Sequence, residues 1–341
     1  MSMPKKVLVT GAGGFIGGHV VKYFLNQSLQ IVALFHKEQA EKESQIQKRN
    51  IQKSELLSRL PSATAENFTI VDGDITIKAD VDAVFHDHQP DAIIHTAALL
   101  IAPKETDELA CKRFSEINEA SALADSIAEY QKINNTFYCM LISTIFVLDT
   151  TAEDIDENTP YKPTGLYAKS KATAELNWRL KIANLIVLRP PQVYGPYQFT
   201  PAIMPRIIRK LLLDEDIIRS LNGEMNPIHI KNFIKIIHAL CISSEVGCYC
   251  VNGDGVMSLA AIALQLQNAA TDFLATQGKK PFSAFTISDS AASKALKIND
   301  LRLMQFFNLK FPDSNPHELI SFENTATEMT MAMAGHVAHN H

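Results

Sequence analysis

A glycine-rich turn between a short apolar run and an amphipathic stretch is the feature that most constrains the fold of this chain. The apolar run is Val7–Thr10, and the glycines Gly11, Gly14 and Gly17 follow at once, at the start of a helix-like segment over 15–25. Glycines at such a bend let backbone amides approach a pyrophosphate, whose charge faces the helix N-terminus. The spacing is Gly-x-x-Gly-x-x-Gly rather than the Gly-x-Gly-x-x-Gly of the general fingerprint. The turn predicts a dinucleotide site at the start of an α/β chain.

Strand-like and helix-like segments alternate through residues 1–190. Further apolar runs lie at 31–35, 68–71, 92–95, 137–143 and 185–188, and helix-length segments lie at 81–86, 108–132 and 167–181. Continuous apolar strands that alternate with helices are typical of βαβ units in a parallel sheet covered on both faces. We therefore expect the α/β class, with a doubly wound parallel sheet.

The length of 341 residues suggests two domains, or one large domain with an added lobe. After Arg189 the alternation of strand-like and helix-like segments ends, because prolines at 190, 191, 196, 201 and 205 interrupt regular structure. We predict a dinucleotide-binding domain over 1–189, to which 230–256 return, and a smaller C-terminal α/β substrate lobe over 190–229 and 257–325. Residues 38–60 are interpreted as an exposed helix or a mobile insertion. Residues 326–341, rich in Ala, Met and His, are predicted to be a loosely held tail.

Charge and composition exclude several classes of function. Lys and Arg total 32 and Asp and Glu 37, which gives a net charge of −5 without a basic cluster, so a nucleic-acid binder is not expected. The longest apolar stretch, Tyr138–Leu148, is far shorter than the roughly 20 residues that cross a bilayer. Five irregularly spaced cysteines form neither a disulfide framework nor a complete metal site. We expect a cytoplasmic protein without membrane, metal or nucleic acid, acting on a small molecule.

The end of the second predicted strand bears on the choice of cofactor. NAD sites hold the ribose 2′-hydroxyl with an acidic residue about 20 residues after the glycine turn. Here the strand ends in His36-Lys37, without a carboxylate. Lys37, with His36, can instead meet a 2′-phosphate, which favours NADP, with NAD as the alternative. The simpler interpretation is that Lys37 is a solvated charge.

A tyrosine and a lysine one helical turn apart indicate proton chemistry. Tyr167 and Lys171 lie at positions i and i+4, and therefore share a helix face. A nearby ammonium stabilises the phenolate and lowers the phenol pKa, so the tyrosine can exchange a proton with an alcohol or ketone. The preceding strand ends in Ser143-Thr144, and a hydroxyl there can hold the reacting oxygen.

Seven short stretches and one single residue occur in an order that one known family shares. They are VLVTGAGGFIGGH (7–19), VDGDI (71–75), IIHTAA (93–98), Asn118, LISTIFV (141–147), YAKSK (167–171), LRPPQVYGP (188–196) and IHI (228–230). In this combination the chain resembles the extended short-chain dehydrogenase/reductase superfamily, in its NAD-dependent epimerase/dehydratase branch. The resemblance covers about residues 5–312 and is dense as far as 196. It implies a Rossmann domain and a homodimer paired through the helices at 108–132 and 167–181.

The resemblance also implies roles for individual residues. On the catalytic side, Thr144 supplies the hydroxyl, Tyr167 is the acid/base, and Lys171 binds the nicotinamide ribose and tunes Tyr167. Asn118 supports them from the central helix. The cofactor would be lined, from pyrophosphate to adenine and nicotinamide, by Gly11, Gly14, Phe15, Ile16, Gly17, Lys37, Asp74, Ile75, Ala97 and Lys171.

Departures from the family pattern narrow the expected reaction. The family's 4,6-dehydratases follow the catalytic threonine with Asp-Glu, whereas Ile145-Phe146 stand here and cannot transfer protons. A late arginine that grips the substrate diphosphate is absent from 286–290. Arg206 and Arg209 are candidates to replace it, or else form a solvated basic edge.

We therefore predict an NAD(P)-dependent hydride-transfer enzyme, first a nucleotide-sugar epimerase or 4-ketoreductase. One alternative is a ketoreductase or dehydrogenase acting on a non-nucleotide carbonyl or hydroxysteroid-like substrate. Another is a non-catalytic regulator that senses NADP(H). The presence of Thr144, Tyr167 and Lys171 together favours catalysis.

Overall fold

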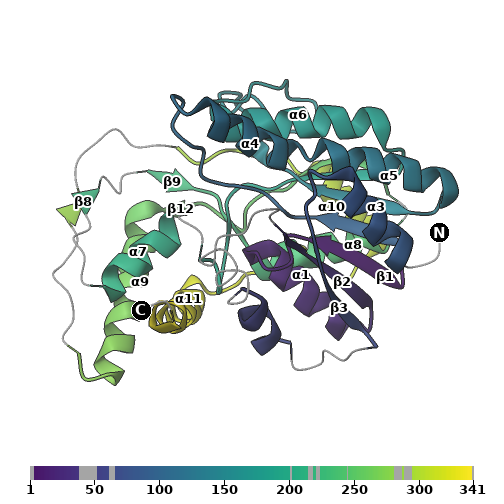
Figure 1. The fold of residues 1–341 in the computed structure, drawn as a ribbon. Coiled ribbons are helices and arrows are strands. Elements are labelled where there is room, and N and C mark those ends of the chain that lie inside the picture. Colours follow the sequence, from purple (N-terminus) through teal and green to yellow (C-terminus); the bar gives the residue numbers. More distant parts are fainter. Residues whose placement is uncertain are drawn as a thin grey trace. The chain divides into compact units, whose positions relative to one another are not determined.

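The computed structural model describes residues 4–37, 52–60, 66–199, 202–213, 218–219, 223–243, 245–279, 286–287 and 294–339 (Figure 1). The chain divides into two compact units. The first unit comprises Met1–Thr151, Glu157–Arg189 and Ile234–Cys250, and the second comprises Ala152–Asp156, Pro190–Phe233 and Val251–His341. The assignment of a cofactor role to one part and a substrate role to the other stays a prediction.

The first unit is built on a seven-stranded sheet with the order β11-β6-β5-β4-β1-β2-β3. All its strand pairs are parallel, which confirms the predicted doubly wound sheet. The chain runs outward from β1 to β3 and then returns to the other side of β1, so the strand order reverses between β1 and β4. The strands are β1 (Lys6–Thr10), β2 (Gln30–His36), β3 (Phe68–Gly73), β4 (Ala92–His95), β5 (Tyr138–Ile142), β6 (Leu185–Arg189) and β11 (Gly247–Cys250).

Helices cover both faces of this sheet (Figure 1). Helices α3, α5 and α6 pack on one face, and α1 lies on the other with α8, whose His238 contacts the rings of Tyr23 and Phe24. A further short helix spans 52–58. The bounds are α1 (Phe15–Asn26), α3 (Lys78–His88), α4 (Glu108–Glu119), α5 (Ser121–Ile133), the 3-10 turn η1 (Ile145–Val147), α6 (Gly165–Lys181) and α8 (Ile230–Cys241).

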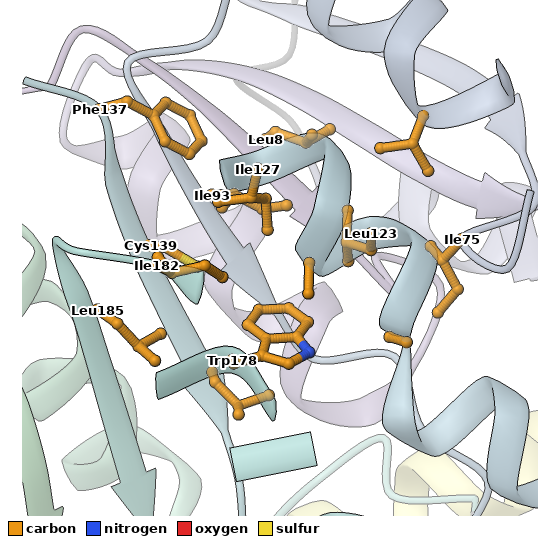
Figure 2. Close-up of a cluster of buried hydrophobic side chains, with 14 of the residues drawn as sticks. Leu8, Ile75, Ile93, Leu123, Ile127, Phe137, Cys139, Trp178, Ile182 and Leu185 are labelled. Carbon is orange, nitrogen blue, oxygen red and sulfur yellow. The ribbon is translucent and has the colours of Figure 1, made fainter. Parts of the chain in front are cut away.

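The core under α3, α5 and α6 explains why these segments fold as they do. Alternate residues of the apolar strands point to this face and meet the apolar stripes of the helices. Trp178 is fully buried there, and its indole Nε1 donates a hydrogen bond to the Glu119 carbonyl at 3.0 Å. Figure 2 shows part of this cluster, with Trp178 together with Leu8, Ile75, Ile93, Leu123, Ile127, Phe137, Cys139, Ile182 and Leu185.

Two local expectations are wrong. The single helix expected over 108–132 is broken at Ala120, whose backbone is left-handed (φ 45, ψ 46) and whose side chain is buried between α4 and α5. The expected loose tail is helical, because Phe322–His339 form α11 and bury Ala326, Met329 and Met333. Of the predicted insertion over 38–60, residues 38–51 lie outside the described part, and 52–58 are helical.

The second unit has its own core, formed where α7, α9 and α11 pack together around Met204, Ile208, Leu266 and Met329. Three two-stranded sheets accompany these helices, with the pairs β10-β7, β12-β9 and β13-β8. No helix in the described part of the chain is both long and apolar enough to span a bilayer. The elements are β7 (Val193–Tyr194), α7 (Ile203–Leu212), β8 (Ile218–Arg219), β9 (Glu224–Met225), β10 (Ile228–His229), β12 (Met257–Ser258), α9 (Leu259–Thr276), β13 (Thr286–Ile287), α10 (Leu301–Lys310) and α11.

Candidate active site

The glycine turn sits at the point where the strand order reverses, which is where doubly wound sheets bind ligands. Gly11 has φ +69, and a Cβ on it would lie 2.7 Å from the Ala97 backbone at the end of β4. A Cβ on Gly17 would lie 2.2 Å from the Gly11 carbonyl oxygen. The turn is thus brought against Ala97, and glycine at these two positions is required by close backbone contact.

The N-terminus of α1 is open to an anion. Gly14 is its N-cap and has no side chain to accept a hydrogen bond from the first turn, which also contains no acidic residue. The amides of Phe15 and Ile16 lie in this turn, where helix N–H groups have no partner within the helix. Such an end attracts negative charge, which is the requirement of a pyrophosphate site.

The residues expected at the adenine end follow β2 and β3. Lys37 is exposed at the end of β2, and its amide donates to the Gly73 carbonyl at 3.3 Å. Asp74 is buried and accepts hydrogen bonds from the Thr76 hydroxyl at 2.6 Å and from Arg113 at 2.9 Å. Burial alone would raise the pKa of Asp74, but these hydrogen bonds outweigh it and lower the pKa. The Ile75 side chain belongs to the hydrophobic cluster.

Thr144 lies two residues after the end of β5 and is buried. Its side-chain oxygen caps η1 by accepting a hydrogen bond from the Phe146 amide at 3.4 Å. The turn η1 packs against α6, the helix that carries Tyr167 and Lys171. The structure therefore brings the three predicted catalytic residues to adjoining elements of one unit.

Tyr167 and Lys171 both change their proton affinity on burial. Burial raises the pKa of the Tyr167 phenol to about 12, and it lowers the pKa of the Lys171 ammonium to about 8 against the opposing charge of Glu175. The expected lowering of the phenol pKa by Lys171 is not found, because burial raises the pKa of Tyr167 instead. At neutral pH the phenol carries its proton.

A short chain of interactions links this pair to the glycine turn. The charge of Lys171 acts on His95 at the end of β4 and, after burial, helps to hold the pKa of His95 well below its usual range. His95 Nδ1 lies 2.7 Å from the hydroxyl oxygen of Thr10, the last residue before Gly11. The carboxyl ends of β1, β4 and β5 thus form one continuous edge.

Asn118 supports that edge from α4. Its side chain accepts a hydrogen bond from the Leu99 amide at 2.7 Å and donates to the Leu99 carbonyl at 3.0 Å. It also donates to the Ser170 hydroxyl at 3.2 Å, beside Lys171. Asn118 therefore ties the segment after β4 to α6, and its support of the catalytic residues stays a prediction.

The sequence alone did not single out three residues of this region, Arg113, Glu175 and Arg189. Arg113 holds Asp74, and Glu175 forms a buried ion pair with Arg189 at 2.7 Å. Glu175 stands one turn after Lys171 and two turns after Tyr167, so the stripe of polar residues at i, i+4 and i+8 was the available signal. The predicted alternatives Arg206 and Arg209 belong to α7, in the second unit.

Comparison with protein families decides the affiliation. The chain matches the NAD dependent epimerase/dehydratase family over residues 7–247, which is more than half its length. The chain belongs to the NAD dependent epimerase/dehydratase family. This family consists of enzymes of the extended short-chain dehydrogenase/reductase type, so the resemblance drawn from the motifs is confirmed.

Two curated relatives of this chain are distant from it in sequence. A dTDP-D-glucose 4,6-dehydratase of Mus musculus is 26% identical over 218 residues, which are 62% of this chain and 56% of that protein. A dTDP-glucose 4,6-dehydratase of Xanthomonas campestris is 28% identical over 220 residues, 61% of this chain and 59% of that protein. The chain thus spans less than two thirds of the length of these curated relatives.

Solved structures of other enzymes share the fold. The enzyme WbmH of Bordetella bronchiseptica, in complex with NAD, has a TM-score of 0.73 and 17% identity, with 97% of this chain and 98% of that chain covered. UDP-glucuronic acid 4-epimerase of Bacillus cereus, also with NAD, has a TM-score of 0.71 and 19% identity, with 97% and 99% covered. At these identities the likeness shows the fold alone.

Proposed function

We propose that this chain is a nicotinamide-dependent hydride-transfer enzyme, a nucleotide-sugar epimerase or 4-ketoreductase, with Thr144, Tyr167 and Lys171 as its catalytic residues. The observation that carries the proposal is the arrangement of these residues. Tyr167 and Lys171 lie on α6 against η1, which Thr144 caps, and the charge of Lys171 reaches His95 beside the glycine turn.

The residues of the chain would divide the chemistry as follows. A bound nicotinamide cofactor supplies or accepts a hydride. Thr144 orients the substrate oxygen by a hydrogen bond, and Tyr167 donates a proton to that oxygen during carbonyl reduction or removes it during alcohol oxidation. Because burial raises the pKa of Tyr167 to about 12, the phenol starts as the proton donor at neutral pH. Lys171 would bind the nicotinamide ribose through its ammonium.

The positions after Thr144 favour this chemistry over dehydration. The relatives named above are dehydratases, and in such enzymes an Asp-Glu pair after the threonine moves protons at neighbouring carbons. In this chain Ile145 is fully buried and Phe146 is partly exposed, and neither side chain transfers protons. What remains is hydride and proton transfer at one carbon.

A substrate panel tests the proposal. The purified protein would be mixed with NAD or NADP and with UDP-glucose, UDP-glucuronic acid, dTDP-glucose or small ketones, and nicotinamide absorbance and products would be followed. We expect a nucleotide sugar to change the redox state of the cofactor. If the cofactor binds but none of these compounds reacts, the chain is the non-catalytic sensor considered above. If only the ketones react, it is the ketoreductase alternative.

Cofactor retention in the same preparation separates the two preferred reactions. An epimerase must reuse its hydride and is expected to keep its cofactor through gel filtration, with no net reduction. A ketoreductase must exchange the cofactor at each turnover, so a cofactor that washes out supports that reaction.

The cofactor choice gives a separate prediction. We propose NADP, because Lys37 is exposed where NAD enzymes place a carboxylate, although the matched structures are complexes with NAD. Lys37→Asp is expected to weaken NADP binding about tenfold or more and to improve NAD binding, since a carboxylate repels a 2′-phosphate and accepts a hydrogen bond from a 2′-hydroxyl. Titration with both cofactors measures the ratio, and Lys22→Asp, at another exposed lysine, is the control. An unchanged ratio for Lys37→Asp means that the 2′ group is recognised elsewhere.

We also propose a cytoplasmic homodimer. The helices α4 and α6 contact each other and leave Leu109, Leu176 and Leu180 exposed, which favours association of two copies through these helices. None of the five cysteines, all of which lie in the described residues, forms a disulfide, which fits a reducing compartment.

A further inference from the structure

A buried ion pair joins two elements beside the proposed catalytic residues. Glu175 lies on α6 and Arg189 ends β6, and their side chains are 0% and 2% exposed. Arg189 donates to both carboxylate oxygens, at 3.2 Å to Oε1 through Nε and at 2.7 Å to Oε2 through a terminal nitrogen. The Arg189 guanidinium lies close enough to compensate the negative charge of a carboxylate enclosed in this way.

The same carboxylate also holds the end of β5. The Ser143 hydroxyl donates to Glu175 Oε1, and Ser143 immediately precedes Thr144. The Ser143 amide donates to the Leu188 carbonyl at 2.7 Å, so the residue is fixed from both its backbone and its side chain. On the opposite oxygen, Oε2 accepts a hydrogen bond from the Tyr161 hydroxyl at 2.6 Å.

We propose that Glu175 is a positioning residue, which fixes the end of β5, and with it the Thr144 hydroxyl, against the helix that carries Tyr167 and Lys171. The inference rests on the proposed function, because it assigns Glu175 a role in that same site. Hydride transfer needs the substrate oxygen within hydrogen-bond reach of both Thr144 and Tyr167. A displacement of about 1 Å between them can cost about a hundredfold in rate.

The position of Glu175 on α6 supports this role. It follows Lys171 by one turn and Tyr167 by two, and therefore lies on the same face of the helix. Its charge opposes the effect of burial on the pKa of Lys171. One carboxylate is thus placed to act on both the strand end and the lysine.

If the ion pair between Glu175 and Arg189 only stabilised the fold, apolar residues could replace it without changing the rate of hydride transfer. Buried ion pairs can often be exchanged for apolar residues of similar volume without loss of stability. The double variant Glu175→Leu/Arg189→Met is therefore expected to fold, and a titration with NAD and NADP measures separately what the loss of the Glu175 charge beside Lys171 does to cofactor binding. If Glu175 positions Thr144, this variant loses at least about tenfold in the rate of hydride transfer. If the pair is only structural, the rate is unchanged.

A matched pair of single substitutions sharpens the test. Ser143→Ala and Tyr161→Phe each remove one hydroxyl that donates to the Glu175 carboxylate, and Tyr161→Phe keeps the ring over which Arg189 lies at 5.2 Å. Ser143→Ala is expected to lower kcat at least about tenfold with cofactor affinity unchanged, whereas Tyr161→Phe changes kcat less than about twofold. Equal effects of the two substitutions on kcat would overturn the proposal. The two single variants decide the question even if the double variant does not fold.

A measurement without substrate separates this proposal from the proposed function. The methyl order parameter of Thr144 would be measured by NMR in the wild type, the double variant and Tyr161→Phe, with the signal assigned by its loss in Thr144→Ser. We expect a lower order parameter in the double variant and a wild-type value in Tyr161→Phe. An unchanged value in the double variant contradicts the positioning role. If wild-type protein reacts with no substrate of the panel while the order parameter behaves as expected, the proposed function fails and the positioning of Thr144 by Glu175 stands.

Discussion

Tyr167→Phe is expected to lower the rate of hydride transfer by about a hundredfold or more, the scale typical of losing an acid/base group. The substitution removes only the hydroxyl, so the packing of the ring on α6 is kept. Cofactor affinity should be unchanged, because the open end of α1 and the ammonium of Lys171 remain. Single-turnover kinetics with the substrate found in the panel, together with a cofactor titration, measure both quantities.

Tyr130→Phe provides the matched control for this experiment. Tyr130 is a partly buried tyrosine of α5 whose hydroxyl donates to the Pro90 carbonyl at 3.3 Å, away from Thr144 and Lys171. Its loss should leave the rate near that of the wild type. Turnover retained by Tyr167→Phe would remove the acid/base role assigned to that phenol.

Gly17→Ala is expected to abolish cofactor binding and to lower the free energy of unfolding by about 3 kcal/mol. The added Cβ would lie 2.2 Å from the Gly11 carbonyl oxygen and 2.7 Å from the Thr96 hydroxyl oxygen. Because the closest of these atoms is backbone of the turn itself, the turn must move, and the amides at the start of α1 move with it. Calorimetric titration with NAD and NADP and chemical denaturation measure the two effects.

The neighbouring Gly18→Ala is the control, since it adds the same methyl group to the same helix. Its Cβ would meet the end of the flexible Arg59 side chain at 3.0 Å, which can shift, and alanine is about 1 kcal/mol better than glycine within a helix. We expect near-normal stability and cofactor binding. Equal damage from the two substitutions would show that the helix, rather than the turn, is sensitive.

Local patterns were sufficient to predict the sheet and the glycine turn, whereas contacts between distant residues were not. The apolar strands and the glycine turn can be recognised from a few consecutive residues, and the structure places them where the pattern indicates. Arg113 pairs with Asp74 across 39 positions and Arg189 with Glu175 across 14, and no local pattern encodes such pairs.

Burial explains the remaining differences. The spacing of Tyr167 and Lys171 predicts their shared helix face but not their desolvation, which decides the direction of the phenol pKa. Similarly, the Ala- and Met-rich end of the chain resembles a loose tail until its helix is seen to supply Met329 and Met333 to a core. The break between α4 and α5 at Ala120 is not marked in the sequence by a glycine.

The packing of the turn η1 limits which substitutions this chain can accept after Thr144. Ile145 is fully enclosed, so an aspartate there would be an unpaired charge in an apolar setting, with a folding penalty of several kcal/mol. Acquiring an eliminating activity through this position would require the surrounding side chains to be rebuilt first. The stability of the fold therefore opposes a change from the proposed hydride transfer to elimination more strongly than it opposes a change of substrate.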